Sequence, residues 1–423
     1  MSTRNRRILL AGGALAVVAL TVTLLAGGRE TSAGVAAGPL AYISNTSSDD
    51  VWVVDLDAQA VVDVVPVGDD PRGIDIAPDN SNVYVANRFD DTVSVIDTTT
   101  NTVADTIDLG ASVLVTATEP YDVVVSPDNA FLYIAMKNGG SENGDGTVAV
   151  AELPSGDVIA EEILDSAASP EGIVVTPDGN KVYVAARGAM YVVDVSDPAN
   201  PSFTGTSGVA ERELVVSPDG EWVYADNNAV RTSDDTAFAT GDSSGERGIA
   251  ISPDGLQLFS TDETDDVWVV DVTPGDPPTT AFLQDIQDVT QSESYGVDLT
   301  DEGDRGLVSF RGSNTVRIFD VATLSFIGPV IDMQFDPGTG TIFGSEPKQL
   351  VISHTIQPTP TPTPTPEPGA ATPTATPTAA APAELPDTGG TPGPDSGLPW
   401  LAILAAVGAA AVAGGAIIAA RRR

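Results

Sequence analysis

The sequence predicts an all-β fold, a seven-bladed β-propeller closed by a composite blade, and three observations support this prediction. Short runs of β-branched and apolar residues alternate with turns rich in Pro, Asp and Asn, which is typical of antiparallel meanders. The dipeptide Pro-Asp recurs after the first strand of successive units. The first unit lacks its first strand, and a matching segment occurs at the end of the repeat region.

The clearest unit spans residues 71–109 and contains four predicted strands, at 74–77, 83–86, 93–96 and 103–107. Within it, Val83 to Asn87 reads VYVAN and is followed by a strand bounded by acidic residues. This segment resembles the YVTN-type β-propeller repeat of bacterial and archaeal surface proteins. The resemblance implies the fold and a place at the cell surface, and it says less about activity.

The spacing of the Pro-Asp dipeptide defines six complete units. Its Pro residues are Pro78, Pro127, Pro177, Pro218 and Pro253. A degenerate form of the dipeptide occurs at Asp301-Glu302. The intervals of 49, 50, 41, 35 and 48 residues suit one four-stranded blade each. The Asp of the motif is expected to cap a tight turn.

The first unit predicts how the ring closes. Segments 41–44, 51–55 and 61–65 match the second, third and fourth strands of the other units, with no first strand before them. Residues 346–353, EPKQLVIS, match the start of another unit, EPYDVVVS at 119–126. We therefore expect a seventh blade with three N-terminal strands and one C-terminal strand, since closure removes exposed sheet edges.

The N-terminal segment, residues 1–37, is interpreted as a signal peptide. Arg4, Arg6 and Arg7 precede an apolar run from Ile8 to Leu25, and small residues follow up to Ala37. The alternative is an uncleaved membrane anchor, because the run is nearly long enough to cross a bilayer. The propeller is then expected to occupy residues 38–356.

The sequence after the propeller predicts a tether. Residues 357–384 alternate Thr and Pro and then become rich in Ala, which favours a disordered, extended stalk. In residues 385–423, an LPDTG motif precedes an apolar run from Trp400 to Ala420 and three Arg residues. The run is long enough for a transmembrane helix.

This order of elements resembles the sorting signal of sortase-anchored cell-wall proteins. The motif residues are Leu385, Pro386, Asp387, Thr388 and Gly389. The resemblance implies two partners, a sortase-type transpeptidase that cleaves between Thr388 and Gly389, and the cell wall. It also implies membrane contact through the C-terminal helix before processing and an extracellular location, anchored to the cell wall or cell surface. A plain C-terminal membrane anchor is the alternative.

Composition excludes several kinds of function. Residues 38–388 contain 12 basic and 58 acidic residues, a net charge of −46, which disfavours nucleic acid as a partner. The chain has no cysteine, so disulfides, thiol catalysis and Cys-ligated metals are excluded. No cofactor is expected.

Large polar residues converge at one predicted face. In a meander the connections alternate between two faces, so equivalent positions share a face. The start of the inner strand carries Arg72, Tyr121, Glu171, Arg212, Arg247, Tyr295 and Lys348. The position after the second strand carries Thr46, Arg88, Lys137, Arg187, Asn228, Glu263 and Arg311.

Eight of those 12 basic residues fall at these two positions, which predicts a basic rim around the channel. Arginine suits carboxylate, sulfate or phosphate groups, so we expect an anionic small molecule or glycan as the ligand. The alternative is that each Arg pairs with a nearby acid, such as Asp69, Asp70 or Asp90.

Two other motifs carry less weight. Residues 141–152 place Asn143, Asp145 and Glu152 at calcium-loop spacing, but Ser141 replaces the first Asp, so a Gly-rich hairpin loop is the preferred interpretation and no metal is expected. Ser243 lies in a Gly-x-Ser-x-Gly motif. The only histidine, His354, is predicted on the opposite face, which excludes a Ser-His pair.

The predicted function is a surface-anchored module for binding or assembly. The first alternative is a secreted lactonase-like hydrolase. Resemblance to lactonase-like propellers implies His, Arg and Glu around the channel; here the His is absent, and general base catalysis would fall on Glu171. The second alternative is a structural surface-layer component without a small ligand.

Overall fold

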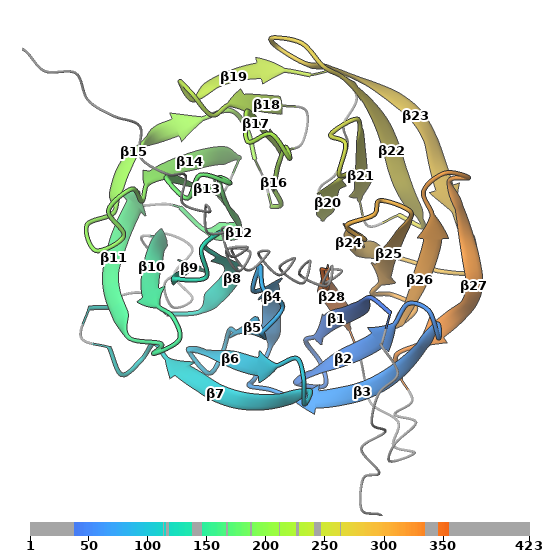
Figure 1. The fold of residues 1–423 in the computed structure, drawn as a ribbon, viewed down its shortest axis with the longest axis horizontal. Coiled ribbons are helices and arrows are strands. Elements are labelled where there is room, and N and C mark those ends of the chain that lie inside the picture. The colour runs from blue at the N-terminus through green and yellow to red at the C-terminus, as the bar shows by residue number, and fades with distance from the viewer. Residues whose placement is uncertain are drawn as a thin grey trace, which may run out of the picture. The chain divides into compact units, whose positions relative to one another are not determined.

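Seven four-stranded antiparallel sheets surround a central channel in the computed structural model (Figure 1). The structure describes residues 38–354 apart from 113, 116–117, 138–145, 166–167, 187, 211, 226–227, 241–246, 263 and 335–345. The predicted all-β, seven-bladed propeller is confirmed. The predicted signal peptide, stalk, LPDTG motif and C-terminal helix lie outside the described residues.

Each blade is one sheet of four strands. Blade 1 contains β28 (Pro347–Ile352), β1 (Leu40–Asn45), β2 (Asp50–Asp55) and β3 (Ala60–Pro66). Blade 2 contains β4 (Pro71–Ile76), β5 (Asn82–Asn87), β6 (Thr92–Asp97) and β7 (Thr102–Asp108). Blade 3 contains β8 (Pro120–Val125), β9 (Phe131–Met136), β10 (Gly146–Glu152) and β11 (Val158–Asp165). Blade 4 contains β12 (Pro170–Val175), β13 (Lys181–Ala186), β14 (Ala189–Asp194) and β15 (Ser202–Ser207).

The remaining blades follow the same order, and the first strand of each complete blade faces the channel (Figure 1). Blade 5 contains β16 (Val215–Val216), β17 (Trp222–Ala225), β18 (Asn228–Arg231) and β19 (Thr236–Ala239). Blade 6 contains β20 (Gly248–Ile251), β21 (Gln257–Thr261), β22 (Asp266–Thr273) and β23 (Thr279–Gln287). Blade 7 contains β24 (Ser294–Leu299), β25 (Arg305–Phe310), β26 (Thr315–Asp320) and β27 (Ser325–Asp332). No helix within the described ranges is long and apolar enough to cross a membrane.

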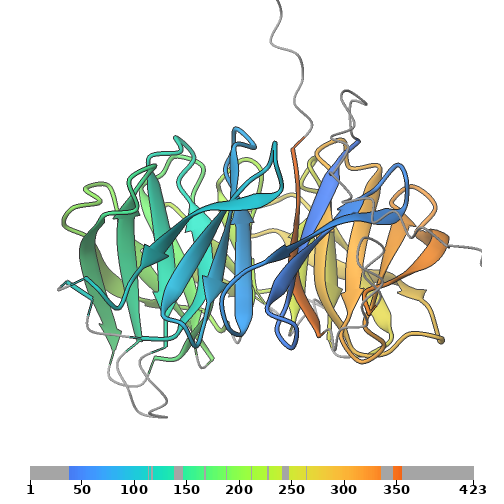
Figure 2. The same ribbon diagram turned by 90° about the horizontal axis from the view of Figure 1, so that it is seen from below.

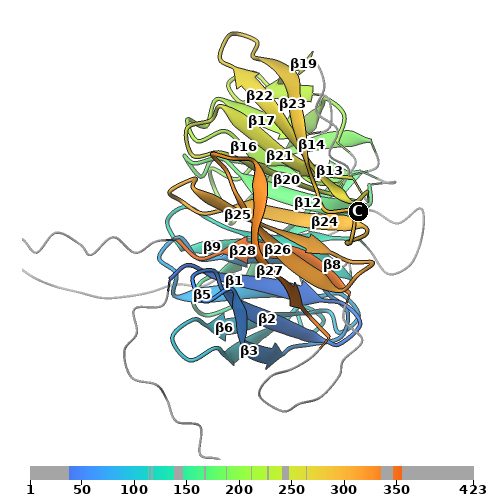
Figure 3. The same ribbon diagram turned by 90° about the vertical axis from the view of Figure 1, so that its right-hand side faces the viewer.

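The ring closes as predicted, through the pairing of the last strand with the first. β28 is antiparallel to β1, with Ile352 opposite Ala41 and Pro347 opposite Asn45. The backbone N–H of Ser353 donates to the carbonyl of Leu40 at 2.7 Å. Both strand ends therefore lie on one face of the disc, which Figures 2 and 3 show from two sides.

The turns between the first and second strands are capped by the Asp of the Pro-Asp motif, as expected. Asp128 Oδ1 accepts a hydrogen bond from the backbone N–H of Ala130 at 3.0 Å and from Ser126 Oγ at 2.6 Å. These bonds lower the pKa of Asp128. The face that carries these turns is called the Pro-Asp face below.

A separate apolar cluster fills each junction between neighbouring blades, which gives seven clusters among the described residues. The cluster that joins blades 7 and 1 includes Trp52, Leu307, Ile318 and Leu350. The cluster that joins blades 5 and 6 is smaller and is built around Trp222 and Leu258. All of these clusters are made from residues 40–352, so this segment contains the whole folded ring.

Glycine allows the inner strands to approach one another closely. A Cβ atom on Gly172 of β12 would lie 2.1 Å from the carbonyl oxygen of Arg212, which belongs to the next blade. A Cβ atom on Gly248 of β20 would lie 2.4 Å from the carbonyl oxygen of Tyr295. Because these neighbours are backbone atoms, a side chain there would force the blades apart.

We expect Gly172→Ala to lower the free energy of unfolding by about 3 kcal/mol, the cost of overpacking a close backbone contact. The measurement is urea unfolding of residues 38–356. Gly110→Ala is the control, because its nearest neighbour, Asp108 Oδ1, would lie 3.5 Å from the new Cβ atom. Equal stability of the two variants would contradict the close approach of blades 4 and 5.

Candidate functional site

The seven residues predicted at the start of the inner strands lie around one end of the channel, called the mouth below. Six of them line one small pocket, together with Glu213 and Gln349: Arg72, Tyr121, Glu171, Arg212, Tyr295 and Lys348. Arg247 lines the larger cavity beneath this pocket. The face assignment made from the sequence therefore brings together residues from widely separated parts of the chain.

Two tyrosine rings fill much of the mouth. The Nζ atom of Lys137 lies 3.5 Å from the centroid of the Tyr121 ring, and the guanidinium carbon of Arg72 lies 5.4 Å from it. Tyr295 is only 8% exposed, and burial raises its pKa to about 12. The pocket that remains has a volume of about 10 Å³, roughly the space of one water molecule. The mouth is therefore closed by its own side chains.

Several cations of the predicted rim form ion pairs with acids beside them. Asp70 Oδ2 lies 3.0 Å from Arg72 Nη2 and 3.5 Å from Arg88 Nη1, as the ion-pair alternative expected. Glu171 Oε1 lies 2.7 Å from Lys137 Nζ, and Glu171 Oε2 lies 3.8 Å from Arg212 Nη1.

The described arginines at the second rim position, the one after the second strand, also form ion pairs. Arg88 Nη2 lies 2.7 Å from Glu119 Oε2, and Arg311 Nε lies 3.4 Å from Glu346 Oε2. Thr46 Oγ1 donates to the carbonyl oxygen of Glu346 at 3.4 Å. Arg187 and Glu263 lie outside the described residues.

Lys348 differs from these cations. It is only 5% exposed, and its Nζ atom lies 4.5 Å from the centroid of the Tyr295 ring. No carboxylate of the described residues lies within ion-pair distance of its ammonium group. Burial, followed by the positive charges of Arg311 and Arg72, lowers the pKa of Lys348 to about 8. The mouth thus contains an almost fully buried lysine whose ammonium group has no acid partner among those residues.

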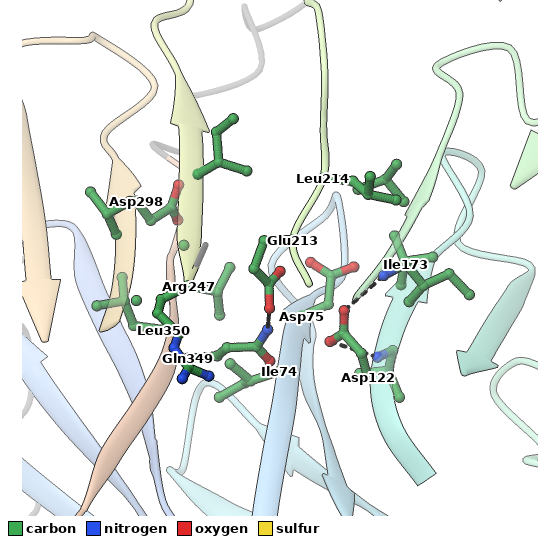
Figure 4. A pocket seen from close by; sticks show the side chains of 18 residues that line it. Ile74, Asp75, Asp122, Ile173, Glu213, Leu214, Arg247, Asp298, Gln349 and Leu350 are labelled. Carbon is green, nitrogen blue, oxygen red and sulfur yellow. Dashed lines mark hydrogen bonds between the residues drawn. The ribbon is translucent and has the colours of Figure 1, made fainter. Parts of the chain in front are cut away.

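A hydrogen bond across the channel separates the mouth pocket from the cavity beneath it. The side-chain amide of Gln349, on β28 of blade 1, donates to Glu213 Oε1, which precedes β16 of blade 5 (Figure 4). Glu213 and Gln349 line both spaces. Burial and the neighbouring charge of Asp122 raise the pKa of Glu213 well above its usual range.

The cavity beneath this bond has a volume of about 210 Å³ and is lined by four acidic side chains: Asp75, Asp122, Glu213 and Asp298. Each Asp accepts a hydrogen bond from a backbone N–H of the next blade; Asp122 Oδ2, for example, is 2.9 Å from the nitrogen of Ile173 (Figure 4). Burial raises the pKa of Asp75 to about 7 and that of Asp298 to about 6. These carboxyl groups thus connect neighbouring inner strands.

These channel residues were not among the predicted site residues, although the sequence carries a signal for them. One residue after the start of the inner strand, four blades carry Gly and the other three carry Asp122, Glu213 and Gln349. Two residues further on, Asp75 and Asp298 interrupt a series of apolar residues. An isolated acid on a channel-facing position is the signal that could have identified them.

The other predicted motifs do not add to this site. Asn143 and Asp145 of the calcium candidate and Ser243 lie outside the described residues, and Glu152 is an exposed residue at the end of β10. The described residues contain no group of three or more His, Asp or Glu side chains that could hold a metal ion. His354 lies on the Pro-Asp face, as predicted, where its Nδ1 atom is 2.9 Å from Asp301 Oδ1.

Comparison with known proteins supports the fold. The model of the LVIVD repeat family matches residues 174–207, which belong to blade 4. No curated protein matches the chain. A protein of unknown function from Desulfotomaculum acetoxidans is similar in structure, with a TM-score of 0.60 and 16% identity over 74% of this chain and 99% of its own.

Two other solved structures are similar at the same level. A 6-phosphogluconolactonase candidate from Bacteroides fragilis has a TM-score of 0.53 and 16% identity, over 75% of this chain and 98% of its own. Hydrazine synthase from Kuenenia stuttgartiensis has a TM-score of 0.55 and 18% identity, over 66% of this chain and 92% of its own. Identities this low show the propeller fold alone.

Proposed function

We propose that this protein is a surface-anchored binding module that holds an anionic ligand at the channel mouth. The observation that carries the proposal is Lys348, a residue only 5% exposed that lines the mouth pocket and has no acid partner among the described residues. Arg72 and Arg212 line the same pocket and can supply further donors to a carboxylate. A protein that is otherwise strongly acidic thus concentrates cations at one opening.

The location belongs to the same proposal. The predicted signal peptide, Thr/Pro stalk and LPDTG sorting signal support export and attachment to the cell wall through a sortase-type transpeptidase, or retention by a membrane helix. Ser353 lies on the Pro-Asp face, opposite the mouth.

We expect anionic ligands to raise the melting temperature of residues 38–356 in a thermal-shift screen of sugar acids, uronic acid oligosaccharides and sugar phosphates. Changing Arg72, Arg212 and Arg247 together to Ala should abolish the rise, because it removes three cations from the mouth and the cavity beneath it. Arg305→Ala is the control, since Arg305 pairs with Asp57 away from the mouth. An unchanged response of the triple variant would refute the site.

A lactonase-like hydrolase is the second candidate, favoured only by the similarity to the Bacteroides protein and by Glu171 at the mouth. If the protein is such a hydrolase, it should turn over lactones, and the Glu171→Gln variant should lose this activity. The carboxylate of Glu171 is already held by Lys137 and Arg212, which argues against a role as general base. A structural surface-layer component would show self-association of residues 38–356 and no response to either class of compound.

A further inference from the structure

The mouth pocket has room for one small group only. Its volume of about 10 Å³ corresponds to about one water-sized sphere. A halide ion or a carboxylate group is larger than this, and a tetrahedral sulfate or phosphate group is larger still. Entry of such a group would require Tyr121 or Tyr295 to move away.

The pairing of charges in the lining leaves one cation in excess. Three cations line the pocket, and two of them have carboxylate partners: Arg72 pairs with Asp70 at 3.0 Å, and Arg212 with Glu171 at 3.8 Å. Lys348 is the third and, among the described residues, has no carboxylate within ion-pair distance. Glu213, the other acid of the lining besides Glu171, accepts a hydrogen bond from Gln349, and its raised pKa favours the neutral form. An isolated buried charge is costly unless a counter-ion or hydrogen-bond partner accompanies it.

We propose that the mouth pocket is a seat for one monovalent anion, a halide ion or a single carboxylate group of a larger ligand, held by the ammonium group of Lys348. Arg72 and Arg212 lie in the same lining, and Tyr121 and Tyr295 limit its size. This inference rests on the proposed function and specifies its ligand class. The smaller groups need the least movement of the two tyrosine rings, which favours them over sulfates and phosphates.

The seat should depend on pH, because only protonated Lys348 attracts an anion. The charged groups that act on its ammonium are Arg311, Arg72, Glu346 and Asp70. Tyr295, which packs against it, has a pKa near 12 and stays neutral in the range of interest. Since the pKa of Lys348 is about 8, anion binding is present below pH 8 and is lost as the pH rises above it.

The test is thermal unfolding of residues 38–356 at constant ionic strength. Sodium methanesulfonate, a bulky monovalent salt, is replaced stepwise by sodium chloride or by sodium acetate. At pH 6.5 we expect a rise in Tm of about 2–4 °C at a tenfold excess over the dissociation constant, and no rise at pH 10. A response to chloride alone identifies a halide seat, and a response to acetate alone identifies a carboxylate seat.

Two neutral variants connect the response to the ammonium group. Lys348→Met keeps the length of the side chain and should lose the response, and Lys348→Gln provides a second neutral side chain should the first variant fail to fold. Arg305→Gln removes a positive charge away from the mouth, and this variant should retain the response to anions. A response that persists without Lys348, or no response to either anion in the unchanged protein, would overturn the seat.

Failure of the seat and failure of the proposed function are distinguishable. A larger anion that still binds in the ligand screen, without any effect of chloride or acetate, would leave the binding module and remove the seat. Conversely, a chloride response that depends on Lys348, without any organic ligand in the screen, would support the seat and contradict the binding module.

Discussion

Leu350→Asp is expected to unfold most of the propeller at 25 °C. Leu350 is 8% exposed and belongs to the cluster that joins blades 7 and 1. Removing a buried leucine side chain costs about 2–5 kcal/mol, and burying a carboxylate in its place costs several more. Since domains of this kind are stable by about 5–15 kcal/mol, the loss is comparable with the total.

The measurement is circular dichroism and urea unfolding of residues 38–356. Leu114→Asp is the matched control, because Leu114 is 46% exposed and should tolerate the same change. A folded Leu350→Asp variant with stability close to that of the control would mean that β28 does not close the ring in solution.

Stability should fall as the pH rises from 4 to 8. The pKa of Asp75 is raised to about 7 and that of Asp298 to about 6, mainly by burial. A raised carboxyl pKa means that the folded state binds more protons than the unfolded state in this range, so the free energy of unfolding decreases with pH. A tenfold change in an acid dissociation constant corresponds to about 1.4 kcal/mol, and solvent entering the cavity reduces the effect, so we expect a loss on the order of 4 kcal/mol for the two groups together.

Below about pH 4 the trend reverses, and the free energy of unfolding falls as the pH is lowered. The Pro-Asp turn residues Asp79, Asp128, Asp178 and Asp254 have lowered pKa values because they accept hydrogen bonds, so their contribution is lost as they become protonated. The unfolding free energy, measured in urea at each pH, should therefore be greatest at mildly acidic pH.

The double variant Asp75→Asn, Asp298→Asn should flatten the decline between pH 5 and 8. It also loses one hydrogen-bond acceptor at each site, which lowers stability at every pH, so the slope is the informative quantity. Asp157→Asn is the control for a single Asp-to-Asn change, because it removes one carboxylate at an exposed position. A double variant with the slope of the unchanged protein would show that these carboxyl groups do not titrate as proposed.

The ring and the composition of its mouth could be predicted because both follow from repetition. The Pro-Asp spacing sets the blade length, the segment around Leu350 supplies the missing strand, and alternation of connections assigns Arg72 and Lys348 to one face. Each of these inferences uses positions that recur in successive blades, so one irregular blade does not change the prediction.

The filling of the mouth could not be predicted in this way. Whether Tyr121 folds over the opening depends on its rotamer and on Lys137, which packs against the ring. The bond between Glu213 and Gln349 depends on the width of the channel, which no local pattern encodes. The partners of the arginines come from loops of irregular length, as with Glu119 beside Arg88.

The pairing of β28 with β1 has a practical consequence for handling this protein. Because Leu40 and Ser353 are neighbours, a purification tag, a surface linker or a fused reporter at either end of the ring emerges from the same side of the disc. Immobilising the ring by one end therefore presents the opposite opening to solution, so affinity measured on a sensor chip should equal that of the free fragment.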